Sequence, residues 1–89
     1  SQVKPPSLGP CPIICPITTE VPRQPCTTNC GHTYELEELV KWRKQSNGKK
    51  CPKCRSDLGT QEFRIHTGLL ELLQPWIDEL DAKENENKS

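Results

Sequence analysis

The stretch CGHTYELEELVKWRKQSNGKKCPKC, residues 30–54, decides the fold of this chain because it places metal-ligand residue types at both ends of a helical pattern. Cys51 and Cys54 are separated by two residues, the spacing at which a tight turn can direct both sulfurs to one ion. Cys30 and His32 offer a thiolate and an imidazole, with a glycine between them that lets the backbone fold closely. A structural zinc ion takes four such ligands in a tetrahedron and leaves no position for a water. The sequence therefore predicts one structural zinc ion bound by Cys30, His32, Cys51 and Cys54.

Disulfide bonds are the first alternative for these residues, because a short chain with six cysteines could be cross-linked in an oxidising compartment. His32, which lies between Cys30 and Cys51 in the sequence, favours the metal site instead. A redox motif of the thioredoxin type is the second alternative for Cys51 and Cys54. It requires a strand-to-helix junction, which residues 48–50 do not provide.

The three other cysteines do not complete a second site of four ligands, because no further cysteine lies between His32 and Cys51. We expect Cys15 and Cys26 to be small buried apolar residues, and Cys11 to be exposed in the N-terminal segment. The sequence thus predicts a single metal ion.

Two segments show apolar residues at helical spacing. The first, over residues 34–45, has acidic residues in its opening turn and basic residues in its last turn, as the helix dipole favours. Ser-Asn-Gly at 46–48 ends it, because Asn and Gly tolerate the left-handed conformation of a helix C-terminus. The second lies over residues 67–80, where Thr67 is expected to cap the start and Pro75 to kink or restart the helix.

With 89 residues, the chain is long enough for one small domain, and a domain of this size often needs a metal ion or a disulfide to be stable. Residues 1–10, with three prolines and few apolar side chains, are predicted to be a flexible linker. Residues 11–80 form the domain, in which frequent prolines before His32 exclude helix and leave loops and short edge strands. Residues 81–89 are predicted to be a disordered polar tail. The expected class is a small α+β fold.

Twelve basic and twelve acidic residues cancel, so the net charge favours neither nucleic acid nor an anionic membrane as a partner. No apolar run approaches the roughly 20 residues of a membrane span, and we expect an intracellular protein, cytoplasmic or nuclear, without membrane association. Basic residues gather between positions 41 and 55, and acidic residues gather between positions 78 and 86. A solvated surface explains both clusters, and a docking patch for an acidic partner is the alternative for the basic one.

Several motifs over residues 13–80 resemble the signature of the U-box, a class of ubiquitin ligase domain. They are Cys15-Pro16-Ile17-Thr18, Pro25, Cys30-Gly31-His32-Thr33-Tyr34-Glu35, Trp42, Cys51-Pro52 and Leu58. In that family U-boxes bind no zinc, whereas the related RING domains bind two ions through eight ligands. This chain keeps the second RING site and lacks the first, since Thr18 replaces one ligand and Tyr34 and Glu35 provide none.

One zinc ion held by C-x-H and C-x-x-C is similar to the SP-RING of SUMO ligases. The resemblance therefore implies a zinc-stabilised RING/U-box-like fold that is intermediate between the U-box and the SP-RING. Such a fold has a central helix, a short β-hairpin or sheet, and a C-terminal helix.

In these families the domain forms no covalent intermediate; it docks a conjugating enzyme charged with ubiquitin or SUMO and holds the thioester in a reactive geometry. The resemblance implies that Ile17, Trp42 and Pro52 bind the conjugating enzyme, although a tryptophan at helical spacing also fits a core position. Arg55 matches the catalytic linchpin position, where a planar guanidinium bridges two carbonyl acceptors. An ordinary surface arginine is the alternative for Arg55.

The resemblance implies, first, a ubiquitin-protein ligase module that binds a ubiquitin-charged conjugating enzyme and promotes transfer to a substrate lysine. The second hypothesis is a SUMO ligase of the SP-RING type. The third is a non-catalytic, zinc-held protein-interaction module, since a fold does not fix a function. Arg55 favours ubiquitin, and the single zinc ion favours SUMO. A homodimer through the apolar surface of the last helix is compatible with each hypothesis.

Overall fold

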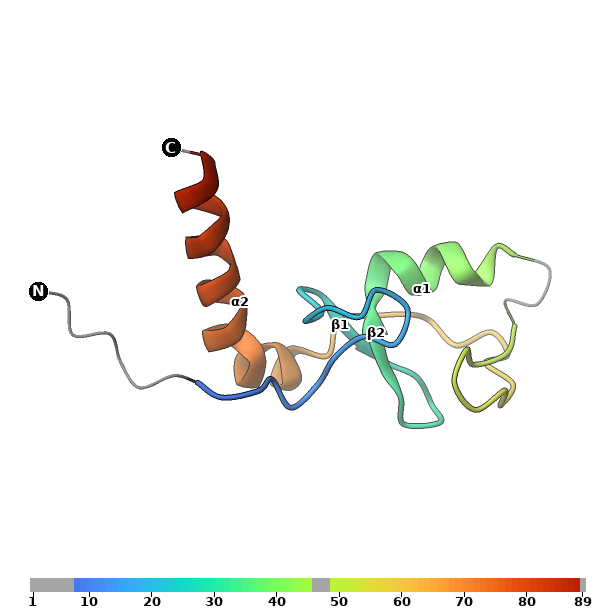
Figure 1. Ribbon diagram of the computed structural model, residues 1–89. Helices are drawn as coiled ribbons and strands as arrows, with labels where there is room; N and C mark the ends of the chain where they lie inside the picture. The colour runs from blue at the N-terminus through green and yellow to red at the C-terminus, as the bar shows by residue number, and fades with distance from the viewer. Residues whose placement is uncertain (1–7, 46–48, 89) are drawn as a thin grey trace, which may run out of the picture.

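The structure is a computed structural model that describes residues 8–45 and 49–88 of the chain. Figure 1 shows the regular elements of this described part in chain order: β1 (Pro25–Thr27), β2 (Thr33–Glu35), α1 (Leu36–Arg43) and α2 (Thr67–Lys88). The predicted small α+β fold, with a short hairpin, a central helix and a C-terminal helix, is confirmed. Within the described ranges, no helix is both long and apolar enough to cross a membrane.

β1 and β2 form an antiparallel hairpin in which Cys26 lies opposite Tyr34. The loop between the strands is closed by Thr28, whose N–H donates to the His32 carbonyl at 2.8 Å and whose Oγ1 accepts from the His32 N–H at 3.3 Å. Gly31 has a φ of 88°, a left-handed conformation that residues with a side chain rarely adopt. The hairpin loop therefore has a defined backbone on both sides of His32.

α1 follows β2 directly and is shorter at both ends than the helix predicted over 34–45. Tyr34 belongs to β2 because pairing with β1 buries its side chain completely, to 0% exposed. The predicted acidic first turn and basic last turn are confirmed. The N–H groups of Lys44 and Gln45 donate to carbonyls three residues earlier, which tightens the end of the helix. The stop predicted at 46–48 lies outside the described residues.

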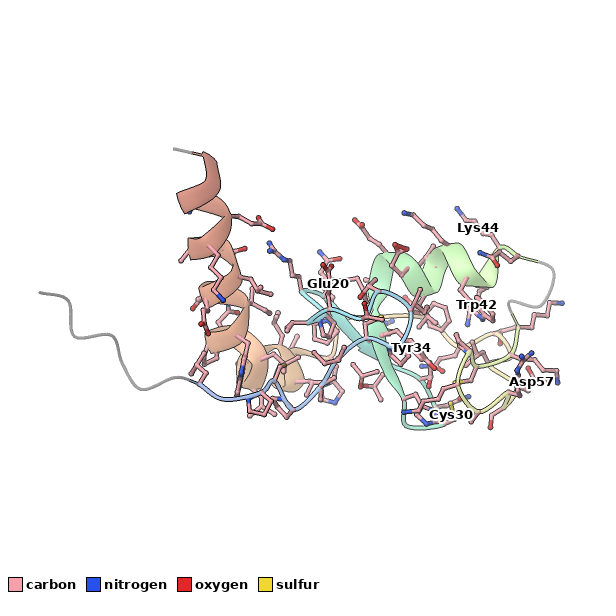
Figure 2. The ribbon with its side chains drawn as sticks, in the orientation of Figure 1. Glu20, Cys30, Tyr34, Trp42, Lys44 and Asp57 are labelled. Atoms are coloured by element: carbon pink, nitrogen blue, oxygen red, sulfur yellow. The ribbon has the colours of Figure 1, made fainter. Side chains whose placement is uncertain are left out.

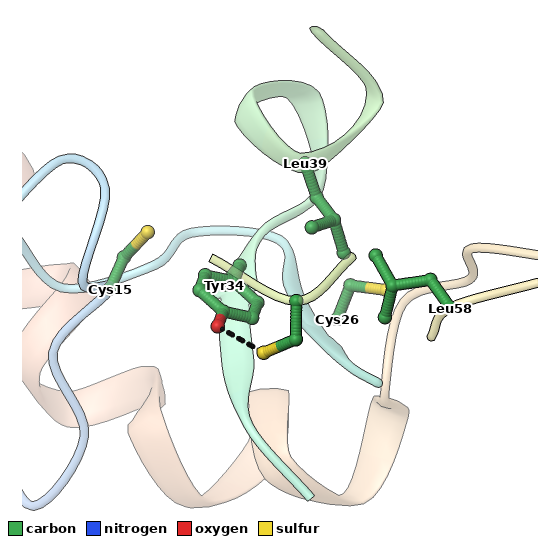
Figure 3. Close-up of a cluster of buried hydrophobic side chains, with 6 residues drawn as sticks. Cys15, Cys26, Tyr34, Leu39 and Leu58 are labelled. Carbon is green, nitrogen blue, oxygen red and sulfur yellow. Dashed lines mark hydrogen bonds between the residues drawn. The ribbon is translucent and has the colours of Figure 1, made fainter. Parts of the chain in front are cut away.

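The core is a small cluster of side chains that are each no more than 1% exposed (Figure 3). They come from the loop before β1, both strands, α1 and the loop after α1. Its members are Cys15, Cys26, Tyr34, Leu39, Cys51 and Leu58. The prediction that Cys15 and Cys26 are buried apolar residues is confirmed. Cys11 is partly buried rather than exposed, because its thiol turns back to the Ile13 carbonyl at 3.1 Å.

α2 is one helix with Pro75 inside it. Figure 1 shows that its first turns run in a different direction from the rest, as expected for a helix that a proline kinks. The predicted cap at Thr67 is wrong: His66 caps the helix, because its Nδ1 accepts the Leu69 N–H at 3.1 Å. The His66 N–H also donates to the Pro25 carbonyl at 2.7 Å, which ties the start of α2 to β1.

The disordered tail predicted over 81–89 is wrong for its greater part, because α2 continues through Lys88. Asp81 and Glu84 both pair with the guanidinium of Arg23, at 2.5 and 2.9 Å. This polar end of the helix is therefore held to the domain by charge rather than by apolar packing. Of the linker predicted over 1–10, the greater part lies outside the described residues.

Candidate metal centre

The structure brings the four predicted zinc ligands together. One ligand atom from each of Cys30, His32, Cys51 and Cys54 lies within 4.8 Å of the others. The Nδ1 atom of His32 lies 3.5 Å from the sulfur of Cys30 and 3.5 Å from the sulfur of Cys51. Zinc bonds of about 2.3 Å to sulfur and about 2.0 Å to nitrogen, at the tetrahedral angle, separate the two ligand atoms by about 3.5 Å. The donor set and its spacing therefore fit a structural zinc ion, with Nδ1 as the histidine ligand.

Two loops that are far apart in the sequence supply these ligands. The hairpin between β1 and β2 carries Cys30 and His32, and a turn after α1 carries the other pair. That turn is closed by backbone hydrogen bonds from the Arg55 N–H to the Cys51 carbonyl at 2.9 Å and from the Cys51 N–H to the Ser56 carbonyl at 2.8 Å. Each loop is thus shaped in part by hydrogen bonds of its own backbone around the ligands.

Hydroxyl groups contact three of the ligand sulfurs. Tyr34 Oη lies 2.9 Å from the Cys51 sulfur, Thr28 Oγ1 lies 2.9 Å from the Cys30 sulfur, and Ser56 Oγ lies 3.1 Å from the Cys54 sulfur. No local sequence pattern indicates these contacts. Tyr34 lies two positions after His32, but its contact with Cys51 joins residues 17 positions apart, which no local spacing indicates.

The electrostatics of the cluster favour a thiolate at Cys51. Burial raises the pKa of its thiol, but hydrogen bonds from the Tyr34 hydroxyl and from the N–H groups of Cys54 and Lys53 outweigh burial and lower the pKa to about 6. Burial likewise raises the pKa of Tyr34, and its contact with the Cys51 sulfur raises it further, so the hydroxyl donates this hydrogen bond. Burial raises the pKa of the Cys30 thiol. A metal ion binds the deprotonated form of cysteine, which Cys51 adopts near neutral pH.

Hydrogen bonds occupy the region where a first RING site would lie. The Cys15 sulfur accepts the Glu35 N–H at 3.2 Å, and the Glu35 carboxylate accepts the N–H groups of Arg23 and Gln24 at 2.8 and 2.7 Å. Thr18 Oγ1 accepts the Glu20 N–H at 3.2 Å. Over residues 8–45 and 49–88, the cluster at His32 is the one group of three or more potential ligands with metal spacing.

The predicted docking residues lie on the loops around this cluster and on α1. Ile17 is 37% exposed, and Pro52 is partly buried. Trp42 is half-buried: its ring packs against the core, and its Nε1 donates to the Lys50 carbonyl at 2.8 Å. Figure 2 shows Trp42 and Cys30 at the end of the molecule opposite α2. Trp42 therefore fills a core position and remains in part accessible.

The loop that carries Ile17, called the first loop, lies next to the turn that carries Cys51 and Cys54, called the second ligand loop. Pro16, which precedes Ile17, and Lys53, which follows Pro52, line one open cavity of about 420 Å³ together with His32. The two loops thus frame a common surface beside the candidate metal centre.

Comparison with known proteins agrees with this geometry. Residues 15–54 match the family described as zinc finger, C3HC4 type, the RING finger. An uncharacterized RING finger protein of Schizosaccharomyces pombe is 55% identical over 47 residues, which cover 53% of this chain and 10% of that protein. U-box domain-containing protein 24 of Oryza sativa is 31% identical over 67 residues, which cover 71% of this chain and 8% of that protein. The E3 ubiquitin-protein ligase TRIM31 of Homo sapiens is 31% identical over 77 residues, covering 85% of this chain and 18% of that protein.

The fold and the ligand cluster agree with a small zinc-finger class of domain, and residues 15–54 match the RING finger family of the C3HC4 type. Its relatives include proteins named E3 ubiquitin-protein ligase and proteins named for a U-box domain. The chain spans less than a fifth of the length of these relatives, at most 18%.

Proposed function

We propose that this domain is a ubiquitin ligase module that binds a ubiquitin-charged conjugating enzyme and promotes transfer of ubiquitin to a substrate lysine. The family and its ubiquitin-ligase relatives support the proposal. The reaction needs no nucleophile from the module, because the thioester and the attacking lysine both come from partners. The module would contribute orientation, which converts a mobile thioester into one held in a reactive geometry.

Arg55 carries the proposal. It has a φ of 65° immediately after the last predicted ligand, a left-handed conformation that costs a residue with a side chain roughly 1–2 kcal/mol. The Arg55 side chain is exposed and makes no hydrogen bond or ion pair with the described residues. A glycine would suit this backbone better, so stability does not explain an arginine here. Binding to partners explains it, since a guanidinium fork can bridge carbonyl groups of the conjugating enzyme and of ubiquitin.

One zinc ion at Cys30, His32, Cys51 and Cys54 would act as the scaffold. All four ligand positions would be taken by protein, so the ion would open no site for substrate and would serve only to join the hairpin loop to the second ligand loop. The loop that carries Pro52 and the residue Arg55 would then be fixed relative to the domain.

Ile17, Trp42 and Pro52 would form the apolar surface for the conjugating enzyme. Ile17 lies on a loop closed by the hydrogen bond from the Thr19 N–H to the Cys15 carbonyl at 2.8 Å. The hydrogen bond of Trp42 to the Lys50 carbonyl fixes the indole ring against the second ligand loop. Fixed side chains lose little conformational entropy on binding, which favours a docking surface.

Discharge of ubiquitin from a charged conjugating enzyme onto free lysine tests the proposal. We expect the wild-type domain to accelerate discharge, and Arg55→Ala to slow it at least tenfold, about 1.4 kcal/mol, while the circular dichroism spectrum and metal content stay unchanged. Arg64→Ala is the matched control, because the Arg64 side chain is exposed and, within the described part of the chain, pairs with Glu62. Equal rates for the wild type and Arg55→Ala would reject the linchpin role.

A SUMO ligase of the SP-RING type is the second candidate, and the single ligand cluster among the described residues favours it. The same assay with SUMO and its conjugating enzyme separates the two candidates. Acceleration with SUMO alone would reject the ubiquitin assignment. If neither modifier is discharged and no conjugating enzyme shifts the amide resonances of Ile17 or Lys53, the domain is a non-catalytic interaction module.

A further inference from the structure

Two exposed lysines flank the surface predicted to receive the conjugating enzyme. The indole of Trp42 donates to the Lys50 carbonyl at 2.8 Å, so Lys50 lies beside the tryptophan. Lys53 follows Pro52 and lines the open cavity of about 420 Å³ together with Pro16 of the first loop. One lysine therefore stands at the α1 side of this surface and the other at its first-loop side.

The charge of these lysines is not neutralised within the described part of the chain. Neither Lys50 nor Lys53 forms an ion pair there, whereas Arg23 and Arg64 both do. The segment from 49 to 58 holds one acidic residue, Asp57, and its carboxylate accepts the Gly59 N–H at 2.8 Å. Its basic residues are Lys49, Lys50, Lys53 and Arg55. The second ligand loop is thus a positively charged rim beside the surface predicted to bind the conjugating enzyme.

We propose that Lys50 and Lys53 select conjugating enzymes that carry acidic side chains on the surface that docks here. The inference rests on the proposed function, and it names the kind of partner that the same surface accepts. Exposed rim charges contribute little affinity, but opposite charges accelerate association and like charges penalise the wrong partner. The apolar residues supply contact area for any conjugating enzyme, and the lysines discriminate among them.

Charge reversal in the full 89-residue chain, loaded with zinc, tests the inference. Lys50→Glu/Lys53→Glu is compared with the wild type in binding to uncharged conjugating enzymes and in ubiquitin discharge. Two conjugating enzymes are used as partners. The first has an acidic contact surface, and the second is a variant of the first in which those acidic residues are replaced by lysine. We expect the wild type to bind the acidic enzyme about tenfold more tightly than its lysine variant at low salt, and the double variant to reverse this order. The difference should shrink at high salt, because ions screen exposed charges.

Arg64→Glu/Lys83→Glu is the matched control, since it changes the net charge by the same amount at exposed residues outside the rim. We expect the control to keep the wild-type preference. The proposal is wrong if Lys50→Glu/Lys53→Glu changes the affinity for both enzymes equally. It is also wrong if the double variant changes the rate of discharge but not the affinity for the uncharged enzyme. Failure of the proposed function looks different: the wild type would then bind the acidic enzyme in a charge-dependent manner and yet accelerate discharge from neither.

Discussion

The hydroxyl of the core residue Tyr34 forms a hydrogen bond with the sulfur of Cys51, which is both a core residue and a candidate zinc ligand. The Tyr34 ring is completely buried, and its hydroxyl ends 2.9 Å from the sulfur. A hydrogen bond to a ligand fixes the orientation of that ligand and stabilises its charged form. The same side chain thus serves the fold and the ion.

Tyr34→Phe keeps the buried ring and removes the hydroxyl donor. We expect the affinity for zinc to fall about tenfold, because contacts of this kind contribute a factor of 10 to 100 to metal binding. Competition with a chromophoric chelator measures the affinity. Thr27→Val is the control, because the Thr27 hydroxyl contacts Thr33 at 2.8 Å and no ligand sulfur. An unchanged affinity in Tyr34→Phe would show that the hydrogen bond does not support the ion.

Arg55→Gly separates backbone strain from function. Glycine adopts a φ of 65° without the steric cost that a side chain incurs, so we expect the zinc-loaded variant to gain about 1 kcal/mol in free energy of unfolding. Ubiquitin discharge should fall as it does for Arg55→Ala. Urea denaturation measures the stability. A loss of stability would mean that Arg55 is retained for the fold.

The ligand residues could be predicted because their pattern is local. Cys51 and Cys54 are two residues apart, and no knowledge of the tertiary structure is needed to see that one turn holds both. The hydroxyl groups at Tyr34 and Thr28 could not be predicted, because their approach to sulfur depends on strand pairing and on the shape of the hairpin loop. The left-handed backbone of Arg55 was equally hidden, since the residue type argues against it.

At the scale of elements, the two helices differ in how they are held. α1 packs Leu39 into the core and is preceded directly by β2. α2 buries Leu73 and Ile77. It is also held by the backbone hydrogen bond of His66 to Pro25, by the Trp76 Nε1 donor to the Gly9 carbonyl at 3.1 Å, and by the ion pairs of Arg23. Exposed ion pairs contribute up to about 1 kcal/mol each, so burial near the kink is what anchors α2.

Leu73→Ala and Leu72→Ala form a matched pair in α2. Leu73 is 0% exposed and Leu72 is 56% exposed, although the residues are neighbours of the same type. We expect Leu73→Ala to lower the free energy of unfolding by roughly 2–5 kcal/mol and Leu72→Ala to lower it by less than about 0.5 kcal/mol. Chemical denaturation of both variants measures the difference. Equal losses would mean that α2 is oriented differently on the domain.

Helical periodicity predicted both helices, and burial and charge contacts corrected their ends. Tyr34 fits the periodic pattern of α1 and yet lies in β2, because pairing offers it complete burial. The residues after 80 are mostly polar, and two of them, Asp81 and Glu84, pair with Arg23, which lies far away in the sequence. Local patterns cannot report a contact between distant residues.

At the scale of the whole molecule, the core is small and much of it consists of cysteine and tyrosine side chains. The described part extends over 53 × 25 × 18 Å. α2 lies at one end, and Cys30 of the candidate metal centre lies toward the other (Figure 2). A domain with so little apolar interior depends on cross-links for stability. We expect zinc binding to supply much of the folding free energy.

The number of metal ions bound per chain tests whether Cys30, His32, Cys51 and Cys54 hold a single structural zinc ion. Native mass spectrometry of the zinc-loaded chain should show one zinc ion, and a strong chelator should remove it and abolish native helicity in circular dichroism. Two ions per chain would contradict the account, because a second site would have to form where hydrogen bonds join Cys15 and Glu35. A chain that binds no zinc and remains folded in chelator would contradict it as well.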